Sequence, residues 1–522
     1  MGRVLVTEAI AETGVQLLRA AGHSVEISLG LDPAGLLDAV AGAHGLIIRS
    51  ATRIDAAVID AAHELVVIGR AGIGLDNVDV AAATRRGVLV ANAPQSNIIS
   101  AAEHTMALLL AQARNIPQAH AALVAGRWER AAWEGVELHG KTLGVVGLGR
   151  VGALVAQRAS AFGMRLVAYD PYISVDRARQ LGAEALPLEE VVRRSDFLTI
   201  HLPKTPETTG LIGTELLGMA KPELRIINVA RGGIVDEVAL DRALSEGTIA
   251  GAALDVFVAE PTTQSPLFGH DHVVVTPHLG ASTREAQDKA GLAIAEQVSL
   301  ALAGQLVPFA VNIAASAVPE GVAPFVPLAE RLGRLWASLA RELPSELEIE
   351  YQGGVAEADT RLLTLSVLRG VWSVASDEPV SWVNAAQIAD DRGLAVRATT
   401  ASATGDYVNL VTVRGGDHAV SGTVFAHNGV PRIVMVDDHD IELPLARWIL
   451  VVRNDDRIGM VAAAASVIAG FGLNIVDLKL GRSDAGGTAM MALSFEQAVP
   501  PEAVAALAGT GGIVEVALLS EV

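Results

Sequence analysis

A glycine-rich segment at residues 143–170, LGVVGLGRVGALVAQRASAFGMRLVAYD, constrains the fold of this chain more than any other feature. An apolar run enters a turn at Gly147, Gly149 and Gly152, and a helical stretch follows. In this strand–turn–helix setting, G-x-G-x-x-G lets the chain turn tightly, approach a pyrophosphate closely and pack helix on strand. The free N–H groups of the helix N-terminus attract the anion. The segment predicts a dinucleotide-binding turn, and a glycine-rich turn in an ordinary α/β domain is the weaker alternative.

The end of the same segment indicates which dinucleotide is bound. The second strand-like run, Arg165–Tyr169, ends in Asp170, where a ribose hydroxyl needs an acceptor. Asp170 would repel a 2′-phosphate, and the next arginine is Arg177. We therefore expect NAD rather than NADP.

Length and composition restrict the class of protein. A chain of 522 residues corresponds to three or four domains at roughly 150 residues each. Its net charge of −20 disfavours binding to nucleic acid or anionic membranes, and the absence of cysteine excludes disulfides and thiol nucleophiles. Neither a signal peptide nor a membrane span is recognisable, so we expect a cytoplasmic protein.

Apolar runs alternate with helical stretches through the first 300 residues, which predicts two doubly wound α/β lobes. The strand-like runs lie at 3–6, 25–28, 46–49 and 65–69, and then at 143–147, 165–169, 197–200, 225–229, 251–254 and 273–275. One long helix is expected over about 98–124. A further helix over 281–304 would return the chain to the first lobe.

The C-terminal part is organised differently. Ala314–Pro327 is rich in proline and alanine and predicts a linker. Residues 345–447 mix short strands and helices with few motifs. From about Trp448 the pattern predicts a ferredoxin-like βαββαβ unit.

Three residues follow strand-like runs at positions suited to hydride-transfer chemistry: Arg231, Glu260 and His278. His278 would be the acid/base because imidazole titrates near neutral pH, and Glu260 would raise its pKa. The planar guanidinium of Arg231 matches an α-hydroxy or α-keto carboxylate. Each residue alone is more often a surface or packing residue, but the three together favour a catalytic set. No metal-ligand spacing is present, so no metal site is expected.

Several runs resemble the signature blocks of the D-isomer-specific 2-hydroxyacid dehydrogenase family. They are GRAGIGLDNVD (69–79), NAPQSNIISAAEHT (92–105), NVARGGIVDE (228–237), ALDVFVAEP (253–261) and TPHLGAST (276–283). Together with the C-terminal unit, they resemble the long-form branch of that family, which acts on 3-phosphoglycerate. The resemblance covers almost the whole chain. In that family the Arg, Glu and His of these blocks are catalytic, which implies Arg231, Glu260 and His278 here.

The resemblance also implies a division into domains. A substrate-binding domain would comprise 1–97 and 284–312, and an NAD-binding Rossmann domain 98–283. An intervening domain that senses anions or substrate would cover 317–445, and a regulatory ACT domain 448–522.

The resemblance further implies the binding residues for each ligand. The implied cofactor contacts, including the glycine turn, are Gly147, Gly149, Arg150, Val151, Gly152, Asp170, Ala230, Asp255, His278, Gly280 and Ala281. The expected substrate contacts are Arg49, Ser50, Arg70, Gly72, Gly74, Asn97 and Arg130. Among these, the AGIG backbone at 71–74 could form a carboxylate-binding nest, and Arg130 matches a family residue that approaches the phosphate from a neighbouring subunit.

The implied reaction is NAD-dependent oxidation of (R)-3-phosphoglycerate to 3-phosphohydroxypyruvate, the first step towards L-serine. The terminal unit resembles an ACT domain, with Asp456 and Asn474 as candidate contacts for inhibitory L-serine, in a homotetramer. Ile458 replaces the proline of the family's D-x-P-G motif, and Asn454 replaces a residue that is often aromatic. A dimerisation domain without a ligand is the alternative for this unit. For the whole chain, the alternatives are another D-2-hydroxy acid as substrate, or an NAD-sensing transcriptional co-repressor.

Overall fold

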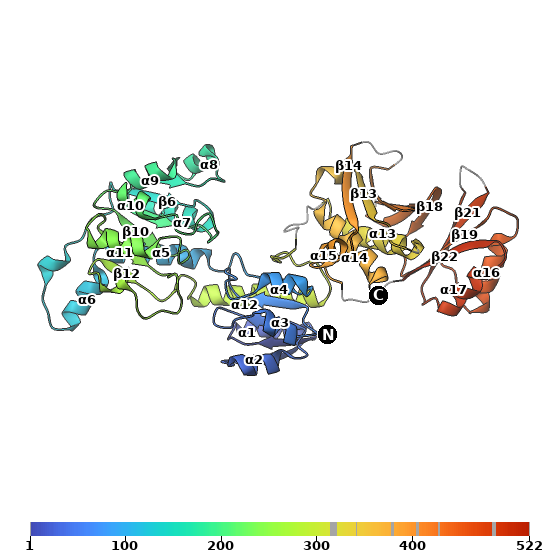
Figure 1. Cartoon of the computed structure of the whole chain (residues 1–522), viewed down its shortest axis with the longest axis horizontal. Helices are drawn as coiled ribbons and strands as arrows, with labels where there is room; N and C mark the ends of the chain where they lie inside the picture. The colour runs from blue at the N-terminus through green and yellow to red at the C-terminus, as the bar shows by residue number, and fades with distance from the viewer. Residues whose placement is uncertain are drawn as a thin grey trace.

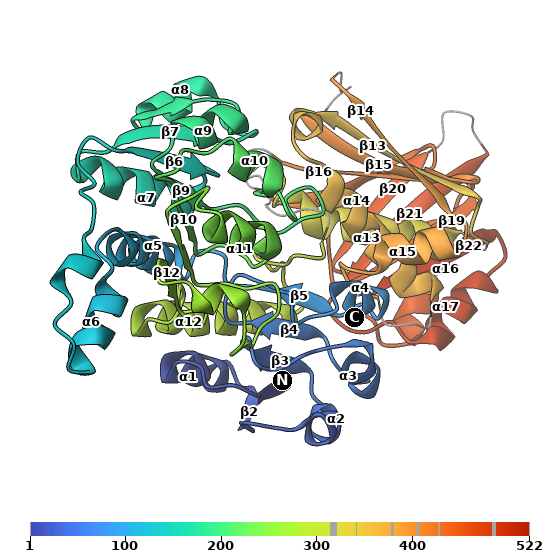
Figure 2. The same ribbon diagram turned by 60° about the vertical axis from the view of Figure 1, so that its left-hand side comes forward.

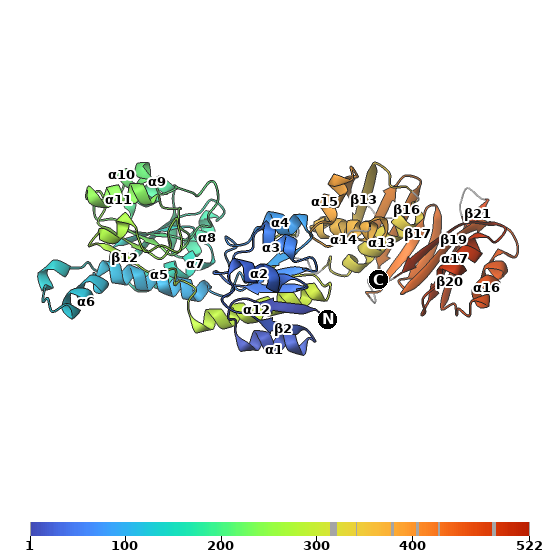
Figure 3. The same ribbon diagram turned by 60° about the horizontal axis from the view of Figure 1, so that its bottom comes forward.

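The chain forms four β-sheets, which lie in a row in space with the second sheet at one end and the first between the second and the third (Figure 3). The computed structural model describes residues 2–313, 321–340, 342–376, 380–402, 407–425, 429–482 and 487–520. We refer to the four units in chain order as the first lobe, second lobe, third unit and fourth unit. Within the described residues, none of the helices has the length and apolar character required to cross a membrane.

The first lobe contains a five-stranded parallel sheet with the order β2-β1-β3-β4-β5. Its strands are β1 (Arg3–Val6), β2 (Ser24–Ile27), β3 (Gly45–Ile48), β4 (Val67–Arg70) and β5 (Leu89–Ala91). Its helices are α1 (Glu12–Ala20), α2 (Pro33–Val40), α3 (Ala56–Ala61) and α4 (Val80–Arg85). Helix α12 (Arg284–Leu302) returns from the second lobe to the first (Figure 2). It buries Ile294 and Val298 against this sheet. The three-residue strand β5 was not predicted.

The second lobe contains a seven-stranded parallel sheet with the order β12-β11-β10-β9-β6-β7-β8. Its strands are β6 (Thr142–Val146), β7 (Arg165–Tyr169), β8 (Ala183–Ala185), β9 (Phe197–Ile200), β10 (Arg225–Asn228), β11 (Gly251–Leu254) and β12 (Val273–Val275). Between them come α7 (Arg150–Ala161), α8 (Val175–Gln180), α9 (Leu188–Arg194), α10 (Thr214–Gly218), α11 (Glu237–Ser245) and the 3₁₀ turn η2 (Pro266–Gly269). The predicted strands are present, and the short edge strand β8 is additional. The strand order reverses at β6, and such a switch point opens a ligand crevice at the carboxyl ends of the strands.

The predicted single helix over 98–124 is wrong, because two helices occupy this segment. Helix α5 (Ile98–Ala113) ends before Asn115, whose φ of 49° lies in the left-handed region. Helix α6 (Ile116–Val124) then begins with Pro117 in its first turn, where a proline needs no hydrogen-bond partner. Helix α6 and the 3₁₀ turn η1 (Arg130–Trp133) form an arm that projects from the second lobe (Figure 1).

The third unit combines helices with a six-stranded mixed sheet of order β14-β13-β15-β16-β17-β18. Its elements are α13 (Phe325–Leu339), β13 (Glu346–Gly353), η3 (Gly354–Glu357), α14 (Arg361–Ala375), α15 (Ala385–Asp391), β14 (Ala395–Ala401), β15 (Asn409–Gly415), β16 (His418–Val424), β17 (Pro431–Val436) and β18 (His439–Pro444). The predicted linker at 314–327 extends too far, since α13 begins at Phe325 and accommodates Pro327 in its first turn. Residues 314–320, with the predicted domain start at 317, lie outside the described residues.

The fourth unit has the predicted ferredoxin-like βαββαβ order. Its elements are β19 (Trp448–Asp455), α16 (Met460–Gly470), β20 (Asp477–Arg482), β21 (Thr488–Phe495), α17 (Pro501–Ala508) and β22 (Ile513–Ser520). The antiparallel sheet, of order β20-β21-β19-β22, is covered on one face by α16 and α17. Its other face joins the core of the third unit, where Ile449 and Val451 belong to the same buried cluster as Trp336 of α13.

Candidate active site

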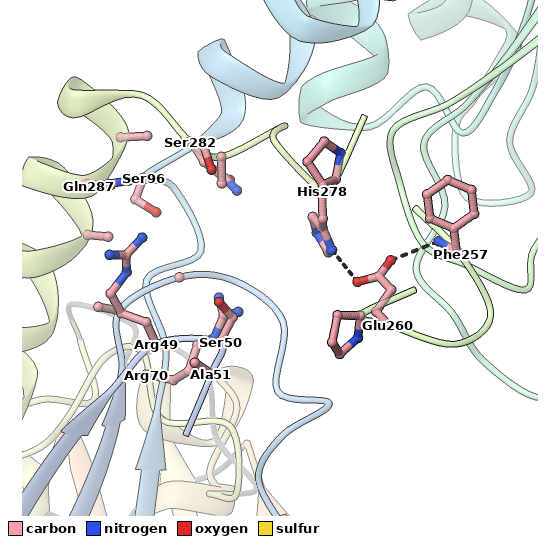
Figure 4. A pocket seen from close by; sticks show the side chains of 18 of the residues that line it. Arg49, Ser50, Ala51, Arg70, Ser96, Phe257, Glu260, His278, Ser282 and Gln287 are labelled. Atoms are coloured by element: carbon pink, nitrogen blue, oxygen red, sulfur yellow. Dashed lines mark hydrogen bonds and ion pairs between the residues drawn. The ribbon is translucent and has the colours of Figure 1, made fainter. Parts of the chain in front are cut away.

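A cavity of about 440 Å³ lies between the two lobes; we call it the interlobe cavity. Arg49, Ser50 and Arg70 line it from the ends of β3 and β4, and His278 and Glu260 line it from the loops after β12 and β11 (Figure 4). Helix α12 contributes Gln287. The cavity therefore brings residues more than 200 positions apart in the sequence to opposite walls of one space.

His278 and Glu260 form a hydrogen-bonded pair on the second-lobe wall. Nδ1 of His278 lies 2.6 Å from Oε2 of Glu260, and Oε1 of Glu260 accepts a hydrogen bond from the backbone N–H of Phe257 at 2.8 Å. The His278 side chain remains 47% exposed, against 32% for Glu260. With Nδ1 engaged, Nε2 is the ring nitrogen available to a ligand in the cavity.

The electrostatics of this pair favour a charged imidazole. The hydrogen bond to Glu260 raises the pKa of His278 above its ordinary value, against the opposing effects of burial and of Arg231. Partial burial on its own would raise the pKa of Glu260, but the hydrogen bonds from His278 and Phe257 lower it. The pair therefore joins a carboxyl group with a lowered pKa to an imidazole with a raised pKa.

Asp255 anchors the loop that carries His278. Its side chain is fully buried, and its carboxylate accepts hydrogen bonds from the backbone N–H groups of Leu279 and Gly280 at 2.7 and 2.8 Å. Thr276 donates its hydroxyl at 2.6 Å, and Nε2 of His104 on α5 lies 3.2 Å away. The oxygens of Asp255 hold the loop, and its expected contact with the cofactor stays a prediction. His104 and Thr276 were not predicted, because neither carries a recognisable motif.

Arg231 lies at the boundary of the two lobes. Asn228 holds its turn with a hydrogen bond from Nδ2 to the Arg231 carbonyl at 3.0 Å, and Gly232 is required because a Cβ there would overlap the Phe257 carbonyl oxygen. Nε of Arg231 lies 3.7 Å from Asp76 of the first lobe. Arg231 is not among the lining residues of the cavity in this conformation, yet its charge influences the pKa values of both His278 and Arg70.

The first-lobe wall of the cavity is cationic and incompletely satisfied. Arg49, Ser50, Arg70 and Asn97 line it. Nε of Arg70 and Oδ1 of Asn97 are buried and find no hydrogen-bond partner in the part of the chain that the structure describes. Burial lowers the pKa of Arg70, and the nearby charge of Arg231 adds to this effect. Because a buried, unsatisfied cation is costly, this wall is suited to an anionic ligand.

The other predicted substrate contacts are Gly72, Gly74 and Arg130, of which Gly72 alone lines the cavity. The amide of Gly72 donates to the Arg70 carbonyl at 2.8 Å, and that of Ala71 donates to Ile48, so these two amides are not part of an open nest. Gly72 lines the cavity, whereas Gly74 lies against Arg231 instead. Arg130 is exposed on the projecting arm and is not among the lining residues.

The glycine turn has the geometry of a dinucleotide cradle. Gly147 has a φ of 94°, and a Cβ on Gly152 would overlap the Gly147 carbonyl oxygen, so both positions require glycine. Helix α7 starts immediately after Gly149. Asp170 accepts hydrogen bonds from the amides of Leu148 and Tyr172, each at 2.9 Å, which leaves lone pairs on both oxygens for a ribose hydroxyl.

The remaining predicted cofactor residues lie on the loops around this cradle. Arg150 is exposed and Val151 half-buried at the start of α7, and Ala230 is half-buried beside Arg231. Gly280 is buried with its amide bonded to Asp255, and Ala281 lines the interlobe cavity. Their contacts with a dinucleotide stay predictions.

A second cavity lies in the fourth unit at the N-terminus of α16. Asn454, Asp456, Ile458 and Gly459 line it, together with Arg482 from β20. Asn474 is exposed and is not among its lining residues, so one chain does not bring Asp456 and Asn474 together there.

Comparisons with known proteins agree with this architecture. The profile of the family "D-isomer specific 2-hydroxyacid dehydrogenase, NAD binding domain" matches residues 106–280. The profile "D-3-phosphoglycerate dehydrogenase intervening domain" matches residues 321–437. The first match covers the glycine turn and all three predicted catalytic residues.

Full-length relatives and solved structures extend these matches. The chain is 46% identical to D-3-phosphoglycerate dehydrogenase from Mycobacterium leprae, over 97% of this chain and 96% of the relative. It is 38% identical to the enzyme of that name from Methanocaldococcus jannaschii, over the whole of both chains. Among solved structures, the TT0316 protein from Thermus thermophilus covers 59% of this chain and 99% of its own, at 39% identity and a TM-score of 0.55. The D-lactate dehydrogenase from Aquifex aeolicus complexed with NAD and lactic acid covers 60% and 100%, at 25% identity and a TM-score of 0.53.

The two-lobed fold, the glycine cradle and the NAD-binding profile define an NAD-dependent dehydrogenase of the D-isomer-specific 2-hydroxyacid class. Both the class and the cofactor predicted from the sequence are thereby confirmed. Within this class, the chain belongs to the D-3-phosphoglycerate dehydrogenase family.

Replacing Glu260 by glutamine tests the His278–Glu260 pair. The amide cannot stabilise the imidazolium as a carboxylate does, so the pKa of His278 should fall. With His278 as the predicted base, oxidation of a 2-hydroxy acid needs the neutral imidazole, so the acid limb of kcat/KM for oxidation should move to lower pH. Reduction of the keto acid then needs the protonated imidazole, so the basic limb of kcat/KM for reduction should also move to lower pH. Unchanged limbs in both directions would show that Glu260 does not control this proton.

Proposed function

We propose that this chain oxidises (R)-3-phosphoglycerate to 3-phosphohydroxypyruvate with NAD⁺, the first step of the phosphorylated route to L-serine. The observation that carries the proposal is the interlobe cavity, in which the His278–Glu260 pair faces a wall containing Arg49 and Arg70 (Figure 4). An acid/base opposite two arginines, of which Arg70 has an unsatisfied Nε, suits a substrate that has an oxidisable hydroxyl and more than one anionic group. The names of the full-length relatives support the same substrate.

In this proposal, His278 takes the proton of the C2 hydroxyl on Nε2 while Glu260 stabilises the resulting imidazolium through Nδ1. Asp255 keeps the loop in place during this transfer, because its carboxylate binds two amides of the loop. Arg231 would exchange its contact with Asp76 for the substrate carboxylate and polarise the C2 oxygen. NAD⁺, when bound, supplies the hydride acceptor.

The residues present fit that cofactor. Gly147 and Gly152 leave the turn without side chains that would block a pyrophosphate, and α7 directs its free amides towards it. Asp170 offers its carboxylate to the ribose hydroxyls. Gly280 and Ala281 would lie near the nicotinamide end, since they belong to the same loop as His278.

The proposal predicts a sharp preference for 3-phosphoglycerate. NADH formation should favour it over D-glycerate and D-lactate by about 100-fold or more in kcat/KM, because those acids lack the second anion. Comparable rates with all three would indicate a different D-2-hydroxy acid as the substrate, and no NADH with any of them would favour a sensing role.

Arg70→Ala should raise KM for 3-phosphoglycerate by about tenfold or more, as expected for a lost charged hydrogen bond. Arg86→Ala is the matched control, since Arg86 is exposed on the same lobe and pairs at 3.9 Å with Asp60. Equal KM values in the two variants would remove Arg70 from the substrate site.

We also propose that the chain acts as a homo-oligomer, a tetramer in the simplest case. The projecting arm supports this, because it exposes Val124 (74%) and Trp128 (81%), which a second copy would cover. Arg130 lies on the same arm and would then approach the partner's cavity. The cytoplasmic location stays a prediction from the sequence.

L-Serine is the proposed effector, bound at the cavity of the fourth unit. Asp456 would bind the amino group and the amides at the start of α16 the carboxylate, with Asn474 added from a second copy. The cavity accommodates a small polar molecule despite Ile458, whose side chain is fully exposed.

Serine should therefore lower the rate of the wild-type chain and raise its melting temperature, since a ligand that binds the folded state stabilises it. Asp456→Ala should abolish both effects at a serine concentration that saturates the wild type, while NADH formation without serine stays unchanged. No effect of serine on either the wild-type rate or its melting temperature would contradict the effector proposal.

A further inference from the structure

We propose that Glu8 is a positioning residue that holds the turn 49–52 so that Arg49 faces the substrate in the interlobe cavity. The inference rests on the proposed function, because it assigns Arg49 to the binding of an anionic substrate. Glu8 belongs to none of the motifs singled out above. It follows β1, and the turn it binds follows the neighbouring strand β3.

The carboxylate of Glu8 binds three of the four backbone amides of this turn. Oε1 accepts hydrogen bonds from the amides of Arg49 at 2.8 Å and Thr52 at 2.9 Å, and Oε2 accepts from the amide of Ala51 at 3.1 Å. Thr7, the residue before Glu8, shares a hydroxyl hydrogen bond of 2.9 Å with Thr52. A single side chain thus satisfies most of the donors of the turn.

The carbonyl groups of the same turn are bound from the opposite side. Nδ2 of Asn77 donates to the carbonyl oxygens of Arg49 at 2.8 Å and Thr52 at 2.6 Å. The Arg49 guanidinium also donates to the Ala9 carbonyl at 3.3 Å, next to Glu8. With donors and acceptors both engaged, the turn has one arrangement, and Arg49 and Ser50 project into the cavity from it.

Glu8 is ionised under the conditions in which such an enzyme works. Its partial burial would raise the pKa of the carboxyl, but the amides of Thr52, Arg49 and Ala51 lower it below the ordinary value. A negative charge next to an anion-binding wall is unfavourable for an anionic substrate. Its presence there is explained by the geometry it imposes on the turn.

The negative charge of Glu8 and its positioning of the turn predict opposite changes in KM for Glu8→Gln, so this variant distinguishes between them. If charge dominated, removing it would lower KM for 3-phosphoglycerate. Because positioning dominates in our proposal, the amide should disorder the turn and raise that KM by about tenfold, with kcat and the affinity for NADH within about twofold of the wild type. Glu8→Asp, which keeps the acceptor oxygens, should show a smaller rise.

Two further variants separate positioning from general damage. Asp38→Asn, an exposed carboxylate on α2 of the same lobe, is the matched control and should leave KM unchanged. Asn77→Ala removes the contacts on the other side of the turn and should reproduce the KM rise even if Glu8→Gln does not fold. In an Arg49→Ala background, Glu8→Gln should change KM by less than about twofold, because its effect passes through Arg49.

An unchanged or lowered KM in Glu8→Gln, or an equal effect in the Arg49→Ala background, would overturn the inference. Failure of the proposed function is distinguishable, since the wild type would then not oxidise 3-phosphoglycerate. In that case the same series is measured with the 2-hydroxy acid that the wild type does oxidise.

Discussion

The site depends on the hydrogen bonds that the buried carboxylate of Asp255 accepts. This carboxylate receives two amides of the loop that carries His278, the Thr276 hydroxyl and the ring of His104. Burial opposes the ionisation of this carboxyl, but these donors more than compensate and lower its pKa. The backbone of His278 has a φ of 55°, an uncommon value for a residue with a side chain, which the surrounding hydrogen bonds maintain. Without this anchor, the imidazole would not face Glu260.

The two lobes divide the chemistry between them. The second lobe carries the glycine cradle and the His278–Glu260 pair, and the first lobe carries the arginines that we propose bind the substrate anions. The chain carries a net charge of −20, so anion binding depends on local cations rather than on the field of the whole protein. Helix α12 links the lobes and lines the cavity through Gln287. The third unit packs Trp382 and Val383 into the same core as β4 and β5, which connects the C-terminal half to the sheet of the first lobe.

Sequence reasoning predicted the features that depend on local pattern. Buried parallel strands are continuous apolar runs, so most of them were found, and the fold class and family are confirmed. It missed β5 and β8, which have three residues each, and the break at Asn115, where a left-handed residue interrupts an apolar helical pattern. The contact of Asp255 with His104 joins residues 151 positions apart. The contacts of Glu8 with the 49–52 turn join residues about 41–44 positions apart. No local sequence pattern predicts either set of contacts. Such residues meet only when the chain folds. His278, Glu260 and Arg231 could be predicted because each has a residue type suited to the chemistry and follows a strand-like run in the sequence.

In the proposed mechanism, His278 moves the substrate proton, and the second lobe binds the cofactor independently of this residue. The most direct measurement is the turnover of His278→Ala with 3-phosphoglycerate, alongside its affinity for NADH. We expect a loss of turnover by about 10²–10⁴ with NADH affinity close to that of the wild type. Near-normal turnover in a verified His278→Ala protein would contradict it.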